Sequence, residues 1–153
     1  MELVYRPYYY SKVEKFLGTG VLLVLTGQRR VGKSYVMREV VQRKRQDSDS
    51  CVIYIDKEKT DFDFIQNYKA LVAYIDERRE PNKHTFILID EVQEIEGFER
   101  GLRNYYDNPD IDIIVTGSNS DTLSSDLATL LSGRYVEILV QGLSYEEFLI
   151  FHN

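Results

Sequence analysis

The chain contains few of the residues that build disulfides and dedicated metal sites. Its 153 residues include one cysteine, two histidines and no tryptophan. A lone cysteine excludes an internal disulfide and indicates a reducing compartment. Because Cys51 opens an apolar run, we expect its thiol to be buried. Structural zinc sites take four Cys or His ligands, so a metal cage of that kind is excluded.

Long apolar runs are also missing. No run approaches the roughly 20 residues that span a bilayer. The first residues lack the apolar stretch of a signal peptide. We therefore expect a soluble, cytoplasmic protein with no membrane partner.

Positive charge is in deficit, because 25 acidic residues outnumber 19 basic ones and leave a net charge of −6. That balance argues against a surface built to coat nucleic acid. A local basic patch stays open, since Arg38 and residues 43–45 cluster in one segment. Cations at the end of a helix more often complement the helix dipole.

Five apolar, β-branched runs recur along the chain, at residues 21–26, 51–56, 85–90, 111–116 and 135–140. Most are continuously apolar instead of alternating, which is typical of strands buried on both faces of a parallel sheet. Helical periodicity separates them. The sequence therefore predicts a three-layer α/β domain over residues 1–142, with right-handed crossovers between parallel strands.

Apolar side chains at helical spacing predict helices at 34–45, 65–75, 98–105 and 123–131. A Thr60/Asp63 pair resembles a capping box ahead of the second helix. Asn108-Pro109 closes the third helix, and Gly133 is placed to cap the fourth. Residues 143–153 carry a further capping box, so we expect the start of another helix, leading to a region beyond the core.

Tyrosine is abundant, with 12 residues, and four of them crowd the N-terminus: Tyr5, Tyr8, Tyr9 and Tyr10. An aromatic ring just ahead of the first strand could stack on adenine. Such rings more often pack the N-terminal segment onto the core, which is the interpretation we favour.

Residues 27–34, GQRRVGKS, fit the G-x-x-x-x-G-K-[ST] pattern of the phosphate-binding P-loop. An apolar strand precedes the motif and a helix follows it, as the motif requires. Its glycines let backbone N–H groups approach phosphate oxygens. We expect Lys33 to reach the β- and γ-phosphates and Ser34 to ligate Mg²⁺. The predicted nucleotide contacts are Gly27, Gln28, Arg29, Arg30, Val31, Gly32, Lys33, Ser34 and Tyr35.

Two carboxylates follow the apolar run FILI, at Asp90 and Glu91. The carboxyl end of a buried parallel strand lies at the ligand-binding edge of the sheet. We expect Asp90 to hold Mg²⁺ and Glu91 to orient and activate the attacking water, because hydrolysis needs a base beside the metal.

Two further segments carry candidates with open alternatives. Ser118 and Asn119 follow the run 111–116 and could position water or sense phosphate. They could equally cap the helix that begins near Asp121. Arg134 precedes the last strand, where a guanidinium could stabilise transition-state charge on its own or a neighbour's nucleotide. A helix C-terminal cation or a structural ion pair is the alternative for Arg134.

Four segments together resemble the bacterial and archaeal AAA-type ATPases of the P-loop superfamily: TGQRRVGKS, FILIDEVQ, IIVTGSNS and SGRYVEILV-x-x-LSYEEFL. The resemblance implies a P-loop NTPase fold with a five-stranded parallel sheet in the order 5-1-4-3-2. It assigns Walker A to residues 27–34 and Walker B to Asp90 with Glu91. Sensor 1 would fall at Ser118–Asn119 and an arginine finger at Arg134. Family members continue into a helical lid and a C-terminal domain.

The leading hypothesis is a module that hydrolyses ATP to ADP and phosphate with Mg²⁺ and drives conformational change in a larger protein. A P-loop kinase for a small molecule is an alternative, although a kinase must avoid activating water and the Asp90–Glu91 pair speaks against it. A GTPase is weaker, since no Asn-Lys-x-Asp motif occurs. A non-hydrolysing nucleotide-gated binding module is the third possibility. A homo-oligomer, and a nucleic-acid or protein partner beyond the core, stay open.

Overall fold

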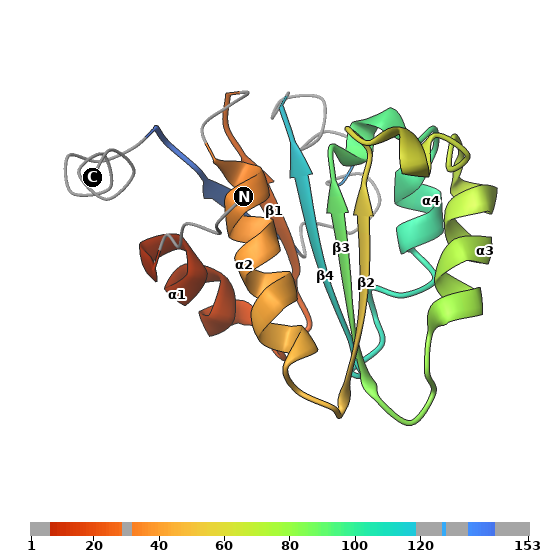
Figure 1. The fold of residues 1–153 in the computed structure, drawn as a ribbon, viewed down its shortest axis with the longest axis horizontal. Coiled ribbons are helices and arrows are strands. Elements are labelled where there is room, and N and C mark those ends of the chain that lie inside the picture. The colour runs from red at the N-terminus through yellow and green to blue at the C-terminus, as the bar shows by residue number, and fades with distance from the viewer. Residues whose placement is uncertain (1–6, 29–31, 119–126, 128–134, 143–153) are drawn as a thin grey trace.

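Five parallel strands form a single sheet in the order β2-β3-β4-β1-β5 (Figure 1). The computed structural model describes residues 7–28, 32–118, 127 and 135–142. The strands are β1 Leu22–Thr26, β2 Ser50–Asp56, β3 His84–Asp90, β4 Ile111–Gly117 and β5 Tyr135–Leu139. This is the predicted order read from the other edge, and each strand end lies within one residue of its prediction. The predicted fold class is therefore confirmed.

Strand β3 lies inside the sheet, with β2 and β4 paired in parallel on its two sides. Six of its seven residues are buried. Successive side chains of a strand point to opposite faces, so both faces of β3 need apolar cover. That requirement explains why the run reads as continuously apolar in the sequence.

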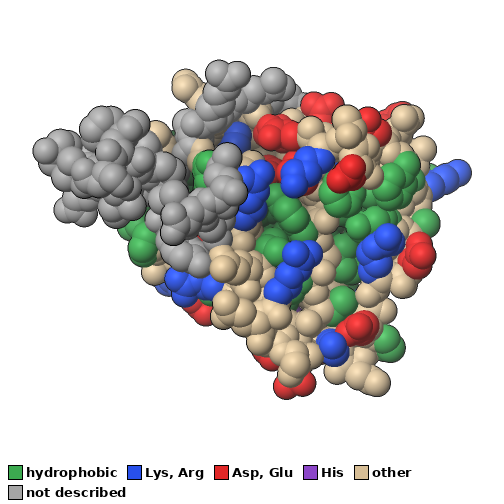
Figure 2. Space-filling model, viewed as in Figure 1, with side chains coloured by type: hydrophobic (Ala, Val, Ile, Leu, Met, Phe, Trp, Pro, Cys, Tyr) green, Lys and Arg blue, Asp and Glu red, His purple; other side chains and the backbone are tan. Residues whose placement is uncertain are grey.

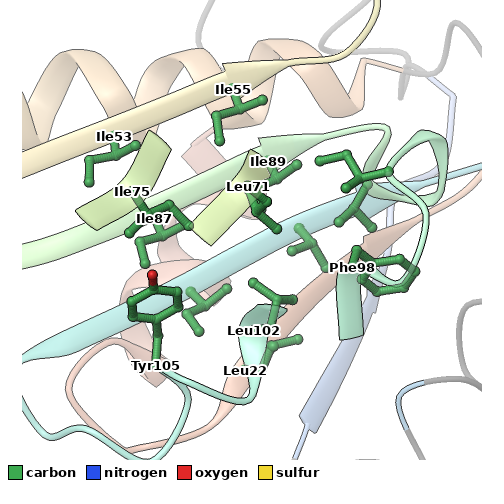
Figure 3. Packing of buried hydrophobic residues seen from close by; sticks show 14 of the residues in the cluster. Leu22, Ile53, Ile55, Leu71, Ile75, Ile87, Ile89, Phe98, Leu102 and Tyr105 are labelled. Atoms are coloured by element: carbon green, nitrogen blue, oxygen red, sulfur yellow. The ribbon is translucent and has the colours of Figure 1, made fainter. Parts of the chain in front are cut away.

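Helices cover both faces and complete three layers (Figure 1). On one face lie α1 Pro7–Phe16 and α2 Lys33–Arg45, packed with Leu23, Leu25 and Leu88. On the other lie α3 Tyr68–Arg78 and α4 Phe98–Leu102, and Figure 3 shows their side chains meeting strand residues such as Ile87 and Ile89. In the described part of the chain, no helix combines the length and apolarity needed to cross a membrane.

The N-terminal helix α1 was not predicted from the sequence. Its residues Tyr9 and Tyr10 are buried, and the backbone N–H of Gln141 donates to the hydroxyl of Tyr9 at 3.0 Å. The packing interpretation is confirmed for these two tyrosines. Tyr8 is 61% exposed, and Tyr5 lies outside the described residues. The thiol of Cys51 is buried as expected.

The predicted start of the helix at 65–75 is wrong. α3 begins at Tyr68, and the side chain of Asn67 caps it by accepting the N–H of Ala70 at 3.0 Å. The Thr60/Asp63 pair belongs instead to a separate turn, the 3-10 helix η1 Thr60–Phe62. Lys57 donates to the carbonyl oxygens of residues 62 and 65, both at 2.7 Å, which satisfies this non-helical backbone.

The other helices match their predictions unevenly. α2 begins one residue earlier than expected, and α4 stops at Leu102. Tyr105 lies beyond α4, where its hydroxyl donates to Asp76 at 2.7 Å. Of the helix expected at 123–131, only Leu127 is described, helical and buried. Its cap at Gly133 and the expected helix in 143–153 lie outside the described residues.

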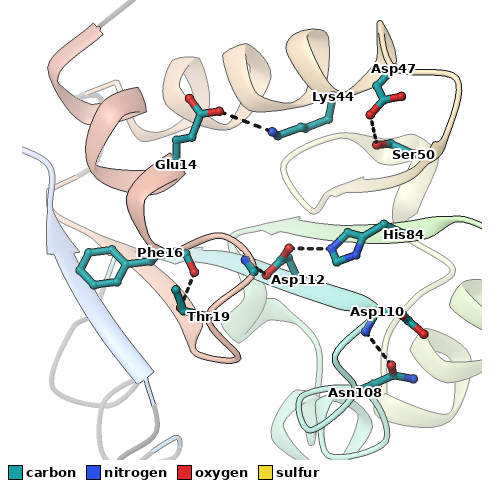
Figure 4. A network of polar contacts seen from close by, with 11 residues as sticks. Glu14, Phe16, Thr19, Lys44, Asp47, Ser50, His84, Asn108, Asp110 and Asp112 are labelled. Carbon is teal, nitrogen blue, oxygen red and sulfur yellow. Dashed lines mark hydrogen bonds and ion pairs between the residues drawn. The ribbon is translucent and has the colours of Figure 1, made fainter.

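Charged side chains of both signs are interspersed on the face shown in Figure 2. Three cations of the basic cluster have acidic neighbours: Arg38 lies 4.0 Å from Asp56, Arg43 lies 3.1 Å from Glu39, and Lys44 lies 3.8 Å from Glu14. These cations therefore take part in ion pairs within the chain. Figure 4 shows the Lys44–Glu14 pair near the edge where strands begin.

The same edge of the sheet holds a polar network centred on Asp112 (Figure 4). Oδ2 of Asp112 lies 2.7 Å from Nε2 of His84, and Oδ1 accepts the N–H of Gly18 at 3.0 Å. Asp112 thereby ties the starts of β4 and β3 to the turn after α1. The candidate site lies at the opposite end of the sheet, where the strands have their carboxyl ends.

Candidate functional site

The candidate site begins where β1 turns into α2. Gly27 and Gly32 both have positive φ angles, of 142° and 98°, a backbone conformation that a side chain would strain. Gly32 is the residue that caps α2, and Lys33 and Ser34 form the first turn. The unpaired N–H groups and the dipole of a helix N-terminus favour an anion at this point. Loop residues Arg29, Arg30 and Val31 lie outside the described ones.

Lys33 points from this turn across the sheet edge. Its Nζ donates to the carbonyl oxygen of Gly27 at 2.6 Å and to that of Gly117 at 3.1 Å. It also lies 3.5 Å from Oγ of Ser118. The residue is only 4% exposed. The ammonium group thus lies between the glycine loop and the end of β4, and polar oxygens surround it.

Ser34 and Asp90 meet although 56 positions separate them. Oγ of Ser34 donates to Oδ2 of Asp90 at 2.6 Å. Asp90 is the last residue of β3 and is 1% exposed. Its other oxygen, Oδ1, accepts the hydroxyl of Thr116 at 2.5 Å. The two predicted Mg²⁺ ligands are therefore adjacent in the structure.

Burial raises the pKa of Asp90, because removal from water penalises the ionised form. Hydrogen bonds from Ser34 and Thr116 act in the opposite direction, while the carboxylates of Asp56 and Glu91 add to the increase. A nearby cation would stabilise the ionised form of this buried carboxylate. Its oxygens and the Ser34 hydroxyl are the hard donors that Mg²⁺ prefers, so this donor set fits the metal.

Glu91 follows Asp90 in a left-handed backbone conformation, with φ 56° and ψ 55°. In the described part of the chain it is the one non-glycine residue with a positive φ. Strain of this kind persists where surrounding contacts fix it, and it gathers at functional sites. Here the N–H of Glu91 donates to the hydroxyl of Thr116 at 2.9 Å.

The carboxylate of Glu91 is held by two side chains. The hydroxyl of Ser118 donates to both of its oxygens, at 3.0 and 3.1 Å. Nε2 of Gln93 donates to Oε2. Glu91 is 6% exposed. The group that could polarise water is thus oriented by Ser118, directly after β4, and by Gln93 in the turn that follows Glu91.

The structure brings five predicted site residues together at the ends of β1, β3 and β4: Lys33, Ser34, Asp90, Glu91 and Ser118. Gln28 is exposed beside the loop, and the ring of Tyr35 lies near Arg38 in α2. Asn119 and Arg134, predicted as catalytic, lie outside the described residues.

Two residues at the site were missed in the sequence, Thr116 and Gln93. Thr116 carried a usable signal, because it is a polar residue closing the apolar run of β4, two positions before the predicted sensor. Gln93 belongs to the segment FILIDEVQ, but nothing in the sequence predicts its contact with Glu91, which depends on the left-handed turn at Glu91.

Comparison with known proteins gives a family match over most of the chain. A family model described as AAA domain matches residues 20–149. A protein of Haemophilus influenzae described as uncharacterized is 33% identical over 151 residues, which cover 96% of this chain and 38% of that protein. A second, from Methanocaldococcus jannaschii, is 26% identical over 130 residues and covers 85% of this chain and 28% of that protein. The chain thus spans well under half the length of these curated relatives.

Solved structures share the fold at low sequence identity. Cdc6p from Pyrobaculum aerophilum aligns with a TM-score of 0.69 at 14% identity, over 99% of this chain and 49% of that one. Hsp104 of S. cerevisiae, in a complex with casein, aligns at 0.68 and 15% identity, over 97% and 28%. The ORC1 protein of Aeropyrum pernix, in complex with DNA, aligns at 0.66 and 13%, over 97% and 49%. These likenesses establish the architecture alone.

Proposed function

The chain belongs to the AAA domain family, and on that premise we propose that it binds ATP with Mg²⁺ and hydrolyses it to ADP and phosphate. The observation that best supports this proposal is the 2.6 Å hydrogen bond between Ser34 and Asp90. It joins the first turn of a helix to the end of a buried strand. This is where a P-loop hydroxyl and a strand-end carboxylate would share a metal ion.

The side chains divide the work in this proposal. Lys33 and the N-terminus of α2 bind the phosphates, since both present positive charge to the same edge of the sheet. Ser34 and Asp90 hold Mg²⁺, which when bound neutralises charge developing on the β- and γ-phosphate oxygens. Glu91 accepts a hydrogen bond from the attacking water, which orients it, and takes its proton as the general base. Ser118 holds Glu91 and lies near Lys33, which supports its assignment as sensor 1.

Hydrolysis is favoured over phosphoryl transfer to a small molecule because a second carboxylate lies beside the metal ligand. The carboxylate of Glu91 contacts Ser118, whose hydroxyl is 3.5 Å from the ammonium of Lys33. A base so close to the phosphate-binding cation would activate water, which a kinase has to exclude. Asn119 and Arg134 keep their proposed roles as water-positioning residue and arginine finger.

Isotope-labelled ATP tests the proposal. The intact protein, supplied with γ-labelled ATP and Mg²⁺, should release labelled phosphate into solution, and EDTA should stop the release. Label found on an added small-molecule acceptor would favour the kinase. Tight nucleotide binding with no release at all would favour the non-hydrolysing, nucleotide-gated module.

The relatives of this chain are longer than the chain itself, so we propose that its ATP cycle acts on a larger protein. We assign residues 1–142 to the ATPase core and 143–153 to the start of the region that follows it. ATP turnover in the core would drive a conformational change in a larger protein. Structures with the same fold are described in complex with DNA and with casein. A nucleic acid, a protein or further copies of the chain are therefore the partner classes to test.

A further inference from the structure

Gln93 contacts the carboxylate of Glu91, the proposed water-orienting group. This contact fixes the orientation of the Gln93 side-chain amide. Gln93 lies in the short 3-10 helix η2 Val92–Glu94, directly after Glu91. Its Nε2 donates to Oε2 of Glu91. An ionised carboxylate only accepts hydrogen bonds, so the amide has to turn its NH₂ group toward Glu91. The amide oxygen Oε1 then faces away.

That orientation leaves a polar atom without compensation. Oε1 of Gln93 is buried and has no hydrogen-bond partner among the described residues. A buried acceptor without a partner lowers the stability of a fold, and such groups often mark a functional requirement. An apolar side chain of similar size at this position would avoid the penalty. The glutamine is therefore poorly explained by packing alone.

The backbone of Glu91 is already fixed, which leaves its side chain as the part to be controlled. Thr116 accepts its N–H, and its left-handed φ of 56° sets the direction in which the side chain leaves the turn. Ser118 then holds the carboxylate on the β4 side, with two contacts at 3.0 and 3.1 Å. Gln93 contacts Oε2 from the η2 turn. Together they restrict rotation of the carboxylate.

We propose that Gln93 is a positioning residue. It donates a hydrogen bond to Glu91 and keeps the Glu91 carboxylate oriented so that it can accept a hydrogen bond from the attacking water. The inference rests on the proposed ATP hydrolysis. Gln93 itself touches neither nucleotide nor metal in this scheme. Its removal should therefore change turnover while leaving nucleotide affinity unchanged.

Gln93→Leu in the intact protein tests this directly, because leucine has a similar volume and no donor. We expect kcat to fall by about 10- to 100-fold, the usual result of misplacing a reacting group. ADP affinity by calorimetry should stay within about twofold of wild type. The melting temperature should be unchanged or higher, since the unpartnered amide oxygen is gone.

Two further variants complete the design. Gln93→Met repeats the test with a flexible side chain if leucine packs poorly. Gln66→Leu is the matched control, an exposed glutamine whose backbone carbonyl accepts the N–H of Glu96 and survives the substitution. That control should keep wild-type kcat.

Three results would overturn the inference or the function on which it rests. Wild-type kcat in both Gln93 variants overturns the inference. So does a loss of kcat that comes with a matching loss of ADP affinity or of melting temperature, because that is the signature of a packing residue. Wild-type protein that binds ATP and releases no phosphate overturns the proposed function first, and the role of Gln93 falls with it.

Discussion

The backbone N–H of Glu91 donates a hydrogen bond of 2.9 Å to the hydroxyl of Thr116 on the neighbouring strand. That hydroxyl has one hydrogen to give, and it donates it to Oδ1 of Asp90 at 2.5 Å. A single buried oxygen on β4 thus contacts both acidic residues at the end of β3, Asp90 and Glu91. The alignment of the two carboxylates depends on it.

Thr116→Val should destabilise the protein although it preserves the shape of the side chain. The N–H of Glu91 would be buried without a partner, at a penalty of about 1–3 kcal/mol. In thermal unfolding, this corresponds to roughly 2–4 °C for each kcal/mol in a domain of this size. The matched control is Thr85→Val, because the Thr85 hydroxyl is equally buried and has no partner in the described structure. That control should be neutral or stabilising. Equal losses in both variants would contradict the role given to Thr116.

Glu91→Gln should abolish most turnover and preserve nucleotide binding. The amide has similar size and still accepts a hydrogen bond from Ser118, but it is too weak a base to activate water. We expect phosphate release to fall by at least about 100-fold, the contribution of a positioned general base. A malachite-green assay and calorimetry with ADP measure the two effects. Glu94→Gln, on the exposed side of the same turn, is the control. Unchanged phosphate release in the Glu91 variant would rule out its role.

Lys33→Ala should weaken nucleotide binding. Hydrogen bonds between charged partners contribute about 1.5–3 kcal/mol, so the dissociation constant for ADP should rise by roughly 10- to 100-fold. Lys69→Ala provides a comparison, since Lys69 is an exposed lysine on α3, outside the P-loop. Wild-type affinity in the Lys33 variant, by calorimetry, would refute a phosphate contact.

Asp90→Asn should raise the melting temperature measured in EDTA at neutral pH. Burial raises the pKa of Asp90 above its ordinary value of 3.8. The folded protein therefore binds a proton at Asp90 more tightly than the unfolded chain does. The free energy of unfolding falls as the pH rises from the pKa of Asp90 in the unfolded chain to its raised pKa in the folded protein. Asparagine removes the buried charge. The same variant should lose the stabilisation that Mg²⁺ with ADP gives the wild type. A melting temperature well below wild type in EDTA would count against this account.

The strands could be predicted closely because parallel strands buried on both faces leave a plain signal. Each run is apolar throughout, and the polar residues that stop it mark the sheet edge. The same logic located Asp90 and Ser118. The P-loop was identified for a different reason: its glycines and its lysine are set by backbone geometry and charge, which the sequence shows directly.

Features that depend on tertiary contacts were harder to predict. The start of α3 was placed too early because Ile65 fits the helical spacing, whereas its carbonyl is bound by Lys57 and the true cap is Asn67. Helix α1 did carry a signal that the sequence interpretation missed, because its buried residues Tyr9, Tyr10 and Val13 lie at helical spacing. The contact of Gln93 arises from the left-handed backbone at Glu91, which no sequence pattern announces.

Strand β3, flanked by β2 and β4 and covered on both faces, also sets where motion can arise. Backbone amides in such a strand exchange with solvent only when the whole domain opens. The strand that ends at Asp90 therefore stays fixed while a nucleotide binds and leaves. A spectroscopic label anchored near β3 would serve as a stationary reference, and a changing distance from it would report displacement of the other labelled segment.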